Sequence, residues 1–237
     1  FLNSVTLVIY PLLSEKASLG DRVGMRSTIA SSMRLIVFVT LPLILAVAIL
    51  RHQVIAIIYQ RGSFSEQDAA FTALALLYLV LGLTTTGISS IFGHAVLALQ
   101  ETRAAVAVTI CSQAVAIGLF VLLVPRMDVA GLALASSLVP LSSALLYYLY
   151  LSRFVSGLHV IFLHSTYIKT IALSIVSSII IYLITTIAIA PLLQAVIALL
   201  AAATVYLLLA KVWRIEEMAQ LWDIINEKKK KLLSLKL

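Results

Sequence analysis

The side chains with the clearest chemical potential lie on one face of an apolar stretch near the middle of the chain. Thr86, Ser90 and His94 are spaced four residues apart, and Gly82 precedes them at the same spacing. In a helix this spacing places all four residues on one face. His94 is ionisable and lies well inside the apolar stretch, where such groups mark functional sites by default. The face predicts a hydrated path, although small and hydroxyl residues at this spacing also let membrane helices pack closely.

Basic side chains near the ends of apolar stretches could meet a phosphate group. Arg34, Arg103 and His94 lie near the inner ends of predicted helices. We predict that these three side chains, together with Ser90 and Thr86, bind substrate. The alternative is that the arginines only extend to the membrane surface and set the topology.

Residue types that support catalysis or metal binding are missing from the apolar stretches. All ten carboxylates lie in polar segments, so no carboxylate base faces a membrane site. We find no paired metal-ligand spacing, no glycine-rich phosphate loop and no nucleophile triad. The single cysteine, Cys111, excludes an internal disulfide. We therefore expect no enzyme activity, no catalytic residue, no metal and no cofactor.

The composition is that of an integral membrane protein. The 237 residues are 62% hydrophobic and 11% charged, and the mean hydropathy is +1.11. The net charge of +7 could suggest a nucleic-acid partner, but seven of the seventeen Lys and Arg residues lie in the last 27 positions. A basic tail close to the membrane accounts for them better, so we expect membrane lipids and no nucleic acid as partners.

The apolar stretches predict an all-α, polytopic transmembrane bundle, because about 20 apolar residues span a hydrocarbon core roughly 30 Å thick. The expected helices cover residues 1–13, as the end of an incomplete span, then 35–50, 69–99, 104–124, 129–151, 167–190 and 192–210. The stretch 69–99 is longer than a span needs, so it must tilt, kink or project. Pro42 should kink the helix that contains it.

The connections between the expected helices are polar. Residues 15–34 form a polar segment, although the positions before Leu35 can extend the next helix, and 52–59 form an interfacial turn or that helix's end. Ser65 and Asp68 have the spacing of a capping box that starts the helix 69–99. Residues 125–128 make a tight turn.

The segment after residue 210 is amphipathic. Ile215 and Met218 keep a near-helical spacing against Glu216 and Glu217. We expect this part of the tail to lie on the membrane surface as a helix, apolar side down. A stop-transfer charge cluster is the alternative for the basic residues that follow it.

The distribution of positive charge predicts the orientation. Connections on one side of the predicted spans carry 14 Lys and Arg residues, and those on the other side carry 3. Positively charged connections stay in the cytoplasm. We therefore expect a cytoplasmic C-terminus and an outward-facing turn at Arg61.

Several segments resemble the MviN/MurJ lipid II flippases of the MOP exporter superfamily. The turn Gln60, Arg61, Gly62, Ser63 and Phe64, followed by Ser65 and Asp68, has the order and spacing of a family motif. Further similar segments are residues 10–14, 95–103, 122–125 and 130–138. Two positions depart from the family: residues 100–105 read Gln-Glu-Thr-Arg-Ala-Ala, and His94 stands where an arginine is common.

The resemblance implies an architecture of two pseudo-symmetric six-helix lobes and a C-terminal helix pair. Residues 1–153 would then be C-terminal-lobe helices, 154–210 the pair, and 211–237 a cytoplasmic basic tail. It also implies that the protein flips an undecaprenyl-linked peptidoglycan precursor across the bacterial cytoplasmic membrane by alternating access. The implied partners are that precursor and an N-terminal lobe of the same protein, and the family's helix pair borders a groove attributed to the lipid tail.

Three other functions remain open at this stage. The protein could export another lipid-linked oligosaccharide or polysaccharide. It could be a multidrug carrier of the same superfamily, which should show an intramembrane carboxylate in its other half. It could also be a non-catalytic membrane scaffold, in which the residues of the polar face would be interchangeable.

Overall fold

The computed structural model describes residues 2–59, 65–187 and 190–218, and within these ranges the regular structure is helical throughout. The elements are α1 (Leu2–Ser18), α2 (Arg22–Tyr59), α3 (Glu66–Leu81), α4 (Leu83–Ala98), α5 (Thr102–Leu151), the 3₁₀ helix η1 (Leu158–Leu163), α6 (Ser165–Thr185) and α7 (Pro191–Val212). Among the described residues, five helical segments are long and apolar enough to cross a membrane. This confirms the expected polytopic helical bundle.

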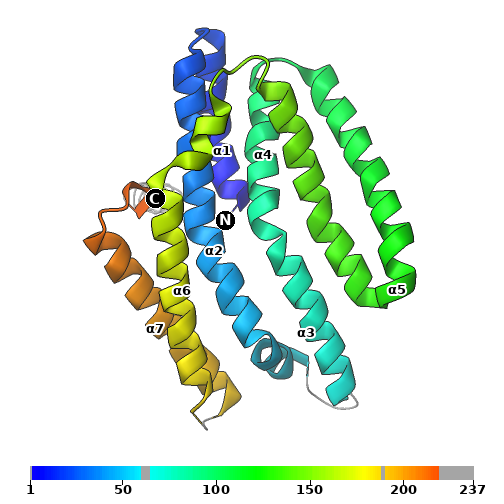
Figure 1. Ribbon diagram of the computed structural model, residues 1–237, viewed down its shortest axis with the longest axis vertical. Helices are drawn as coiled ribbons and strands as arrows, with labels where there is room; N and C mark the ends of the chain where they lie inside the picture. Colours follow the sequence, from blue (N-terminus) through cyan, green and yellow to red (C-terminus); the bar gives the residue numbers. More distant parts are fainter. Residues whose placement is uncertain (1, 60–64, 188–189, 219–237) are drawn as a thin grey trace, which may run out of the picture.

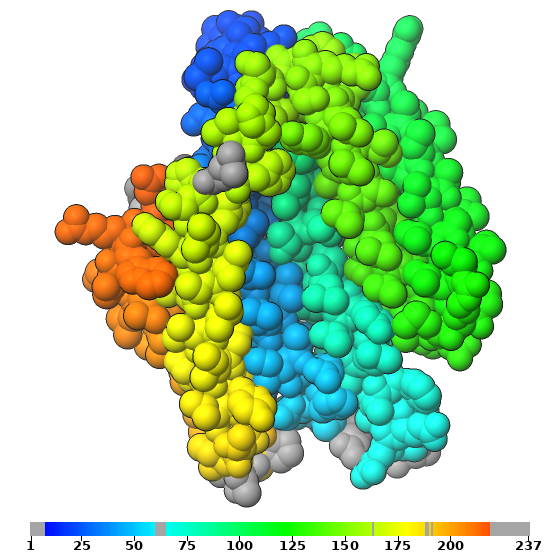
Figure 2. Space-filling model, viewed as in Figure 1, coloured from blue at the N-terminus to red at the C-terminus, as the bar shows by residue number. Residues whose placement is uncertain are grey.

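The helices run roughly parallel to one another, with α2 in the middle (Figure 1). The pair α6 and α7 covers one side of α2, α3 and α4 cover the other, and α5 packs on α3 and α4. Accordingly α2 contacts α1, α3, α4, α6 and α7. Figure 2 shows α2 recessed between α6 and α3. The central helix therefore connects the C-terminal pair to the rest of the bundle.

The first two helices are longer than the sequence predicted. α1 continues to Ser18, and α2 already begins at Arg22, so most of the polar segment 15–34 is helical. The helix forms there because Met25, Ile29 and Met33 bury one face against the core. Residues 52–59 belong to the end of α2, whose last turns bend away from its axis (Figure 1).

The expected helix 69–99 is broken at Gly82 into α3 and α4. Its start is confirmed, because Ser65 Oγ accepts from the Asp68 amide at 3.1 Å and the Ser65 amide donates to Asp68 Oδ2 at 3.1 Å. At the break, a Cβ on Gly82 would lie 2.7 Å from Ser137 Cβ. Glycine therefore allows α5 to approach this helix closely, and the overlong stretch kinks.

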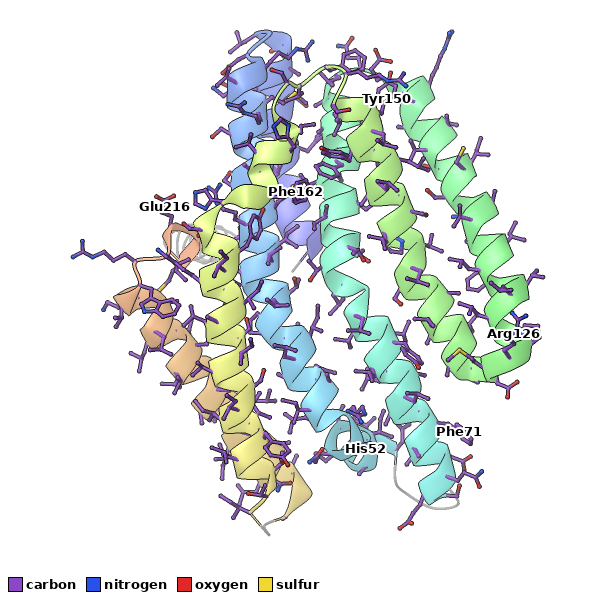
Figure 3. All side chains as sticks on the ribbon, viewed as in Figure 1. His52, Phe71, Arg126, Tyr150, Phe162 and Glu216 are labelled. Carbon is purple, nitrogen blue, oxygen red and sulfur yellow. The ribbon has the colours of Figure 1, made fainter. Side chains whose placement is uncertain are left out.

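The helix α5 is a hairpin of two antiparallel arms. Asp128 has φ 49° and ψ −128°, which is not helical, and the chain reverses there after Pro125. The Leu123 carbonyl oxygen lies so close to Gly131 that a Cβ on residue 131 would overlap it. The predicted tight turn at 125–128 is thereby confirmed, and Figure 3 shows Arg126 at the end of the hairpin.

The C-terminal pair differs from the prediction at its turn. α6 ends at Thr185, five residues before the predicted end, and its last carbonyls need new partners. The Gln194 amide of α7 supplies them by donating to the carbonyl oxygens of Thr185 at 2.8 Å and Ile187 at 3.0 Å. The predicted loop 152–166 contains the short helix η1.

Three clusters of buried side chains hold the bundle together. The largest joins α1, α2, α4 and the second arm of α5, around Ile29, Ile36 and Phe92. A second joins α2, α6 and α7 around Phe38 and Tyr206, and a third lies between the same helices further along. The C-terminal pair thus packs on α2 through cores of its own.

Candidate functional site: a polar helix face, a buried ion pair and an apolar groove

The predicted polar face lies on α4 but is not uniform. Gly82 is buried against α5, Thr86 is exposed, and Ser90 and His94 are half-buried. The Thr86 hydroxyl donates to the Gly82 carbonyl at 2.8 Å, so it satisfies a carbonyl of its own helix. At Gly82 the face therefore serves packing.

His94 is held by a neighbour on its own helix and by α1. Its Nδ1 lies 2.7 Å from the Ser90 carbonyl oxygen, which accepts a hydrogen bond from the Nδ1–H tautomer. The ring also meets Tyr10 edge to face, with centroids 5.6 Å apart. Of the predicted site residues, Ser90 and His94 are thus in contact, through the main-chain carbonyl of Ser90.

The three predicted basic side chains do not form one cluster. Arg103 is exposed in the first turn of α5. Arg34 lies on α2, and its Nε donates to Glu217 Oε1 at 2.5 Å, beyond the end of α7. His94 faces α1 instead. The predicted motif turn, Gln60, Arg61, Gly62 and Phe64, lies outside the described residues.

The ion pair of Arg34 and Glu217 is the main feature that sequence reasoning missed. Glu217 was expected on the polar face of a surface helix, yet its side chain is 0% exposed, and that of Arg34 is 14% exposed. Ile215 was expected to face the membrane, but it is buried in the cluster around Phe38 and Tyr206. No local pattern distinguishes Glu217 from the adjacent Glu216, and only the packing of α7 against α2 separates them.

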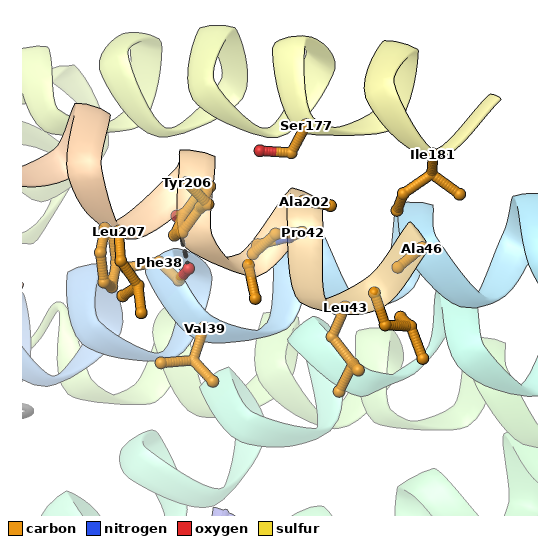
Figure 4. A pocket seen from close by; sticks show the side chains of 12 residues that line it. Phe38, Val39, Pro42, Leu43, Ala46, Ser177, Ile181, Ala202, Tyr206 and Leu207 are labelled. Carbon is orange, nitrogen blue, oxygen red and sulfur yellow. Dashed lines mark hydrogen bonds between the residues drawn. The ribbon is translucent and has the colours of Figure 1, made fainter. Parts of the chain in front are cut away.

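An apolar groove of about 330 Å³ opens between α2, α6 and α7 (Figure 4). Its lining comes from five residues of α2, two of α6 and five of α7: Phe38, Val39, Pro42, Leu43, Ala46, Ser177, Ile181, Leu199, Ala202, Ala203, Tyr206 and Leu207. Only Ser177 and Tyr206 bring a polar side-chain atom to it. Ser177 Oγ is buried and has no hydrogen-bond partner among the described residues. The groove suits a hydrocarbon chain.

One end of the groove is fixed by a proline and a tyrosine. Pro42 has no N–H, so the carbonyl of Phe38, four residues earlier, loses its helical partner. The Tyr206 hydroxyl of α7 donates to this carbonyl at 2.7 Å, and both groups are buried. The two rings also lie against each other, with centroids 5.1 Å apart. The proline in α2 thus frees the acceptor that attaches α7.

The described residues hold no group of three or more His, Cys, Asp and Glu side chains that could bind a metal. The arrangement instead offers hydrogen-bond donors, one buried ion pair and an apolar groove. Features of this kind are suited to binding and orienting a ligand without covalent chemistry.

Comparison with known proteins identifies the family. The family model for the lipid II flippase MurJ matches residues 1–200. The chain belongs to the MurJ lipid II flippase family. One curated relative, the probable lipid II flippase MurJ of Rickettsia prowazekii (strain Madrid E), is 26% identical over 136 residues, which are 57% of this chain and 27% of the relative.

The fold agrees with the MurJ family. A solved lipid II flippase MurJ in an inward closed conformation matches with a TM-score of 0.74 at 21% identity, over 90% of this chain and 43% of that one. The chain therefore spans less than half the length of either protein. The resemblance seen in the motifs is confirmed, and so is the helical transmembrane fold. MurJ flippases are transporters and reside in the inner membrane, so this chain is a multi-pass protein of that membrane.

Proposed function

We propose that this chain forms part of a flippase that moves an undecaprenyl-linked peptidoglycan precursor, lipid II, from the inner to the outer leaflet. The observation that carries the proposal is the family match over residues 1–200. Flipping requires no covalent chemistry, and the described residues offer binding groups without a metal cluster. The mechanism is alternating access, in which two lobes move against each other around a central substrate.

The proposed division of labour follows the three parts of the chain. Residues 1–153 supply one lobe, and 154–210 supply the helix pair whose groove with α2 takes the lipid tail. The groove supports this role because its lining is almost entirely apolar. In this scheme the substrate's charged head group lies between this lobe and an N-terminal lobe. His94, Arg34 and Arg103 contribute positive charge at separate points, and Ser90 and Thr86 lie on the same helix as His94.

The proposed orientation has a cytoplasmic C-terminus. The charge asymmetry of 14 to 3 favours it. The arrangement of the helices supports connections that alternate between the two sides of the membrane. His52 and Arg126 lie at one end of the bundle, and Tyr150 lies at the other (Figure 3). The tail 211–237 would then be exposed to the anionic inner leaflet, where basic residues bind favourably.

The proposal is tested in cells depleted of their own lipid II flippase. Residues 1–237 are expressed alone and together with an N-terminal lobe from a MurJ relative, and growth and membrane insertion are measured. We expect rescue only when both lobes are present, because the chain alone supplies one wall of the substrate cavity. Rescue by the well-inserted chain alone would contradict the two-lobe mechanism. Failure of the pair, at normal insertion, would contradict lipid II as the substrate.

A further inference from the structure

The buried ion pair between Arg34 and Glu217 is only partly satisfied. Arg34 contacts the carboxylate through Nε, and its two terminal nitrogens donate to no described residue. Glu217 Oε2 is buried without a hydrogen-bond partner in the described part of the chain. An arginine and a carboxylate can form two parallel hydrogen bonds, and here they form one. Both members of the pair therefore retain unused binding capacity.

A second donor lies beside this pair. The Tyr167 hydroxyl of α6 is buried and has no partner among the residues described. The charges of both Arg34 and Glu217 act on it, which places it in the same local field. Near the Glu217 carboxylate there are thus donors on two helices, of which Arg34 bonds the carboxylate and the Tyr167 hydroxyl does not.

The resident carboxylate is a weak occupant of this position. A buried carboxylate loses its hydration, and when one of its oxygens is unpaired, hydrogen bonds from the protein compensate only part of that loss. A phosphate offers more acceptor oxygens, and arginine binds phosphate through the two terminal nitrogens that are unused here. The Arg34 side chain is 14% exposed, so a ligand can reach it while Glu217 is still bound.

We propose that Glu217 is an internal competitor that occupies Arg34, and that the diphosphate of a lipid-linked precursor displaces it. The proposal rests on the proposed function for the identity of the ligand. Ile215 and Met218 pack in the cluster around Phe38 and Tyr206, at the end of the groove assigned to the lipid tail. A diphosphate bound at Arg34 would therefore lie next to a tail in the groove.

The experiment measures ligand binding to the chain in phosphatidylcholine nanodiscs. The probe is a polyprenyl diphosphate, and inorganic pyrophosphate is the competitor. The variants are Glu217→Gln, Arg34→Gln and the double variant. Glu216→Gln is the matched control, because it removes the same charge one position away from an exposed side chain. Arg22→Gln, exposed on the same helix as Arg34, is the second control.

We expect Glu217→Gln to lower the Kd about tenfold and Arg34→Gln to raise it about tenfold, the size of one charge-assisted hydrogen bond. The double variant should bind like Arg34→Gln, because the competitor has no effect once its partner is gone. Pyrophosphate should compete better in Glu217→Gln than in the wild type. The thermal midpoint of Glu217→Gln should fall while its affinity rises, which a purely structural ion pair cannot produce.

Three results would overturn the inference. The first is an unchanged or higher Kd in Glu217→Gln. The second is a gain of affinity that persists without Arg34. The third is an equal gain when phosphatidylglycerol replaces the polyprenyl diphosphate, which would assign the position to ordinary anionic lipid. Failure of lipid II transport in cells would leave these Kd values unaffected, so the two proposals fail separately.

Discussion

The attachment of α7 to α2 can be tested through the single hydrogen bond from Tyr206 to the Phe38 carbonyl. Pro42 removes the N–H that would otherwise bind this carbonyl, and Tyr206 replaces it from another helix at 2.7 Å. Substituting Tyr206→Phe keeps the ring in the cluster and removes the hydroxyl, which also lies beside the Ser174 side chain. The Phe38 carbonyl would then be buried without a partner.

The expected cost follows from that unsatisfied group. A buried acceptor left without a donor costs about 1–3 kcal/mol, so Tyr206→Phe should lower the free energy of unfolding by that amount. In a Pro42→Ala background, residue 42 regains its N–H and can bind the Phe38 carbonyl within the helix. The same substitution should then cost less than about 1 kcal/mol, and the difference is the coupling energy of the pair.

The assay is equilibrium unfolding in mixed micelles, with helical content as the signal, for the wild type, both single variants and the double variant. Tyr182→Phe is the matched control, because Tyr182 is 62% exposed and its hydroxyl should contribute little. An equal cost of Tyr206→Phe with and without Pro42 would refute the reasoning. It would mean that Tyr206 acts through packing or through Ser174 and not through the carbonyl that the proline leaves free.

Further predictions concern packing, acid stability and topology. Gly82→Ala should destabilise the chain by about 1–3 kcal/mol in the same unfolding assay, since its Cβ would lie 2.7 Å from Ser137 Cβ; Gly118→Ala, with open space around it, should cost nothing. The Gly24 amide, and then Lys16, hold the pKa of the Asp21 carboxyl below its ordinary value. The ionised form therefore stabilises the folded chain at neutral pH, and this contribution should disappear as the pH falls below about 4. In an acid-unfolding titration, the stability of Asp21→Asn should fall less steeply with decreasing pH than that of the wild type. A cysteine at Ser63 should react with an impermeant thiol reagent in intact cells, and labelling only after permeabilisation would reverse the proposed orientation.

The sequence was sufficient for the fold class, because the length and apolarity of a membrane span are local properties. It also predicted the capping box at Ser65 and Asp68 and the turn at 125–128, because caps and proline-containing turns use neighbouring residues. Helix ends were less predictable. The residues before Leu35 were expected to extend the next helix, but its start at Arg22 was not predicted. Tertiary burial of every third or fourth side chain there outweighs the polarity of the others.

Features that depend on two distant segments were decided only by the tertiary structure. The spacing of Gly82 with Thr86 and Ser90 predicted a shared helix face, but the approach of Ser137 decides that Gly82 packs against α5. Arg34 was a recognisable candidate, but its partner Glu217 is 183 positions away, and nothing local separates that carboxylate from Glu216. Burial of a charge depends on which helix covers it, and that information lies in the packing of α2, α6 and α7, not in the residues beside it.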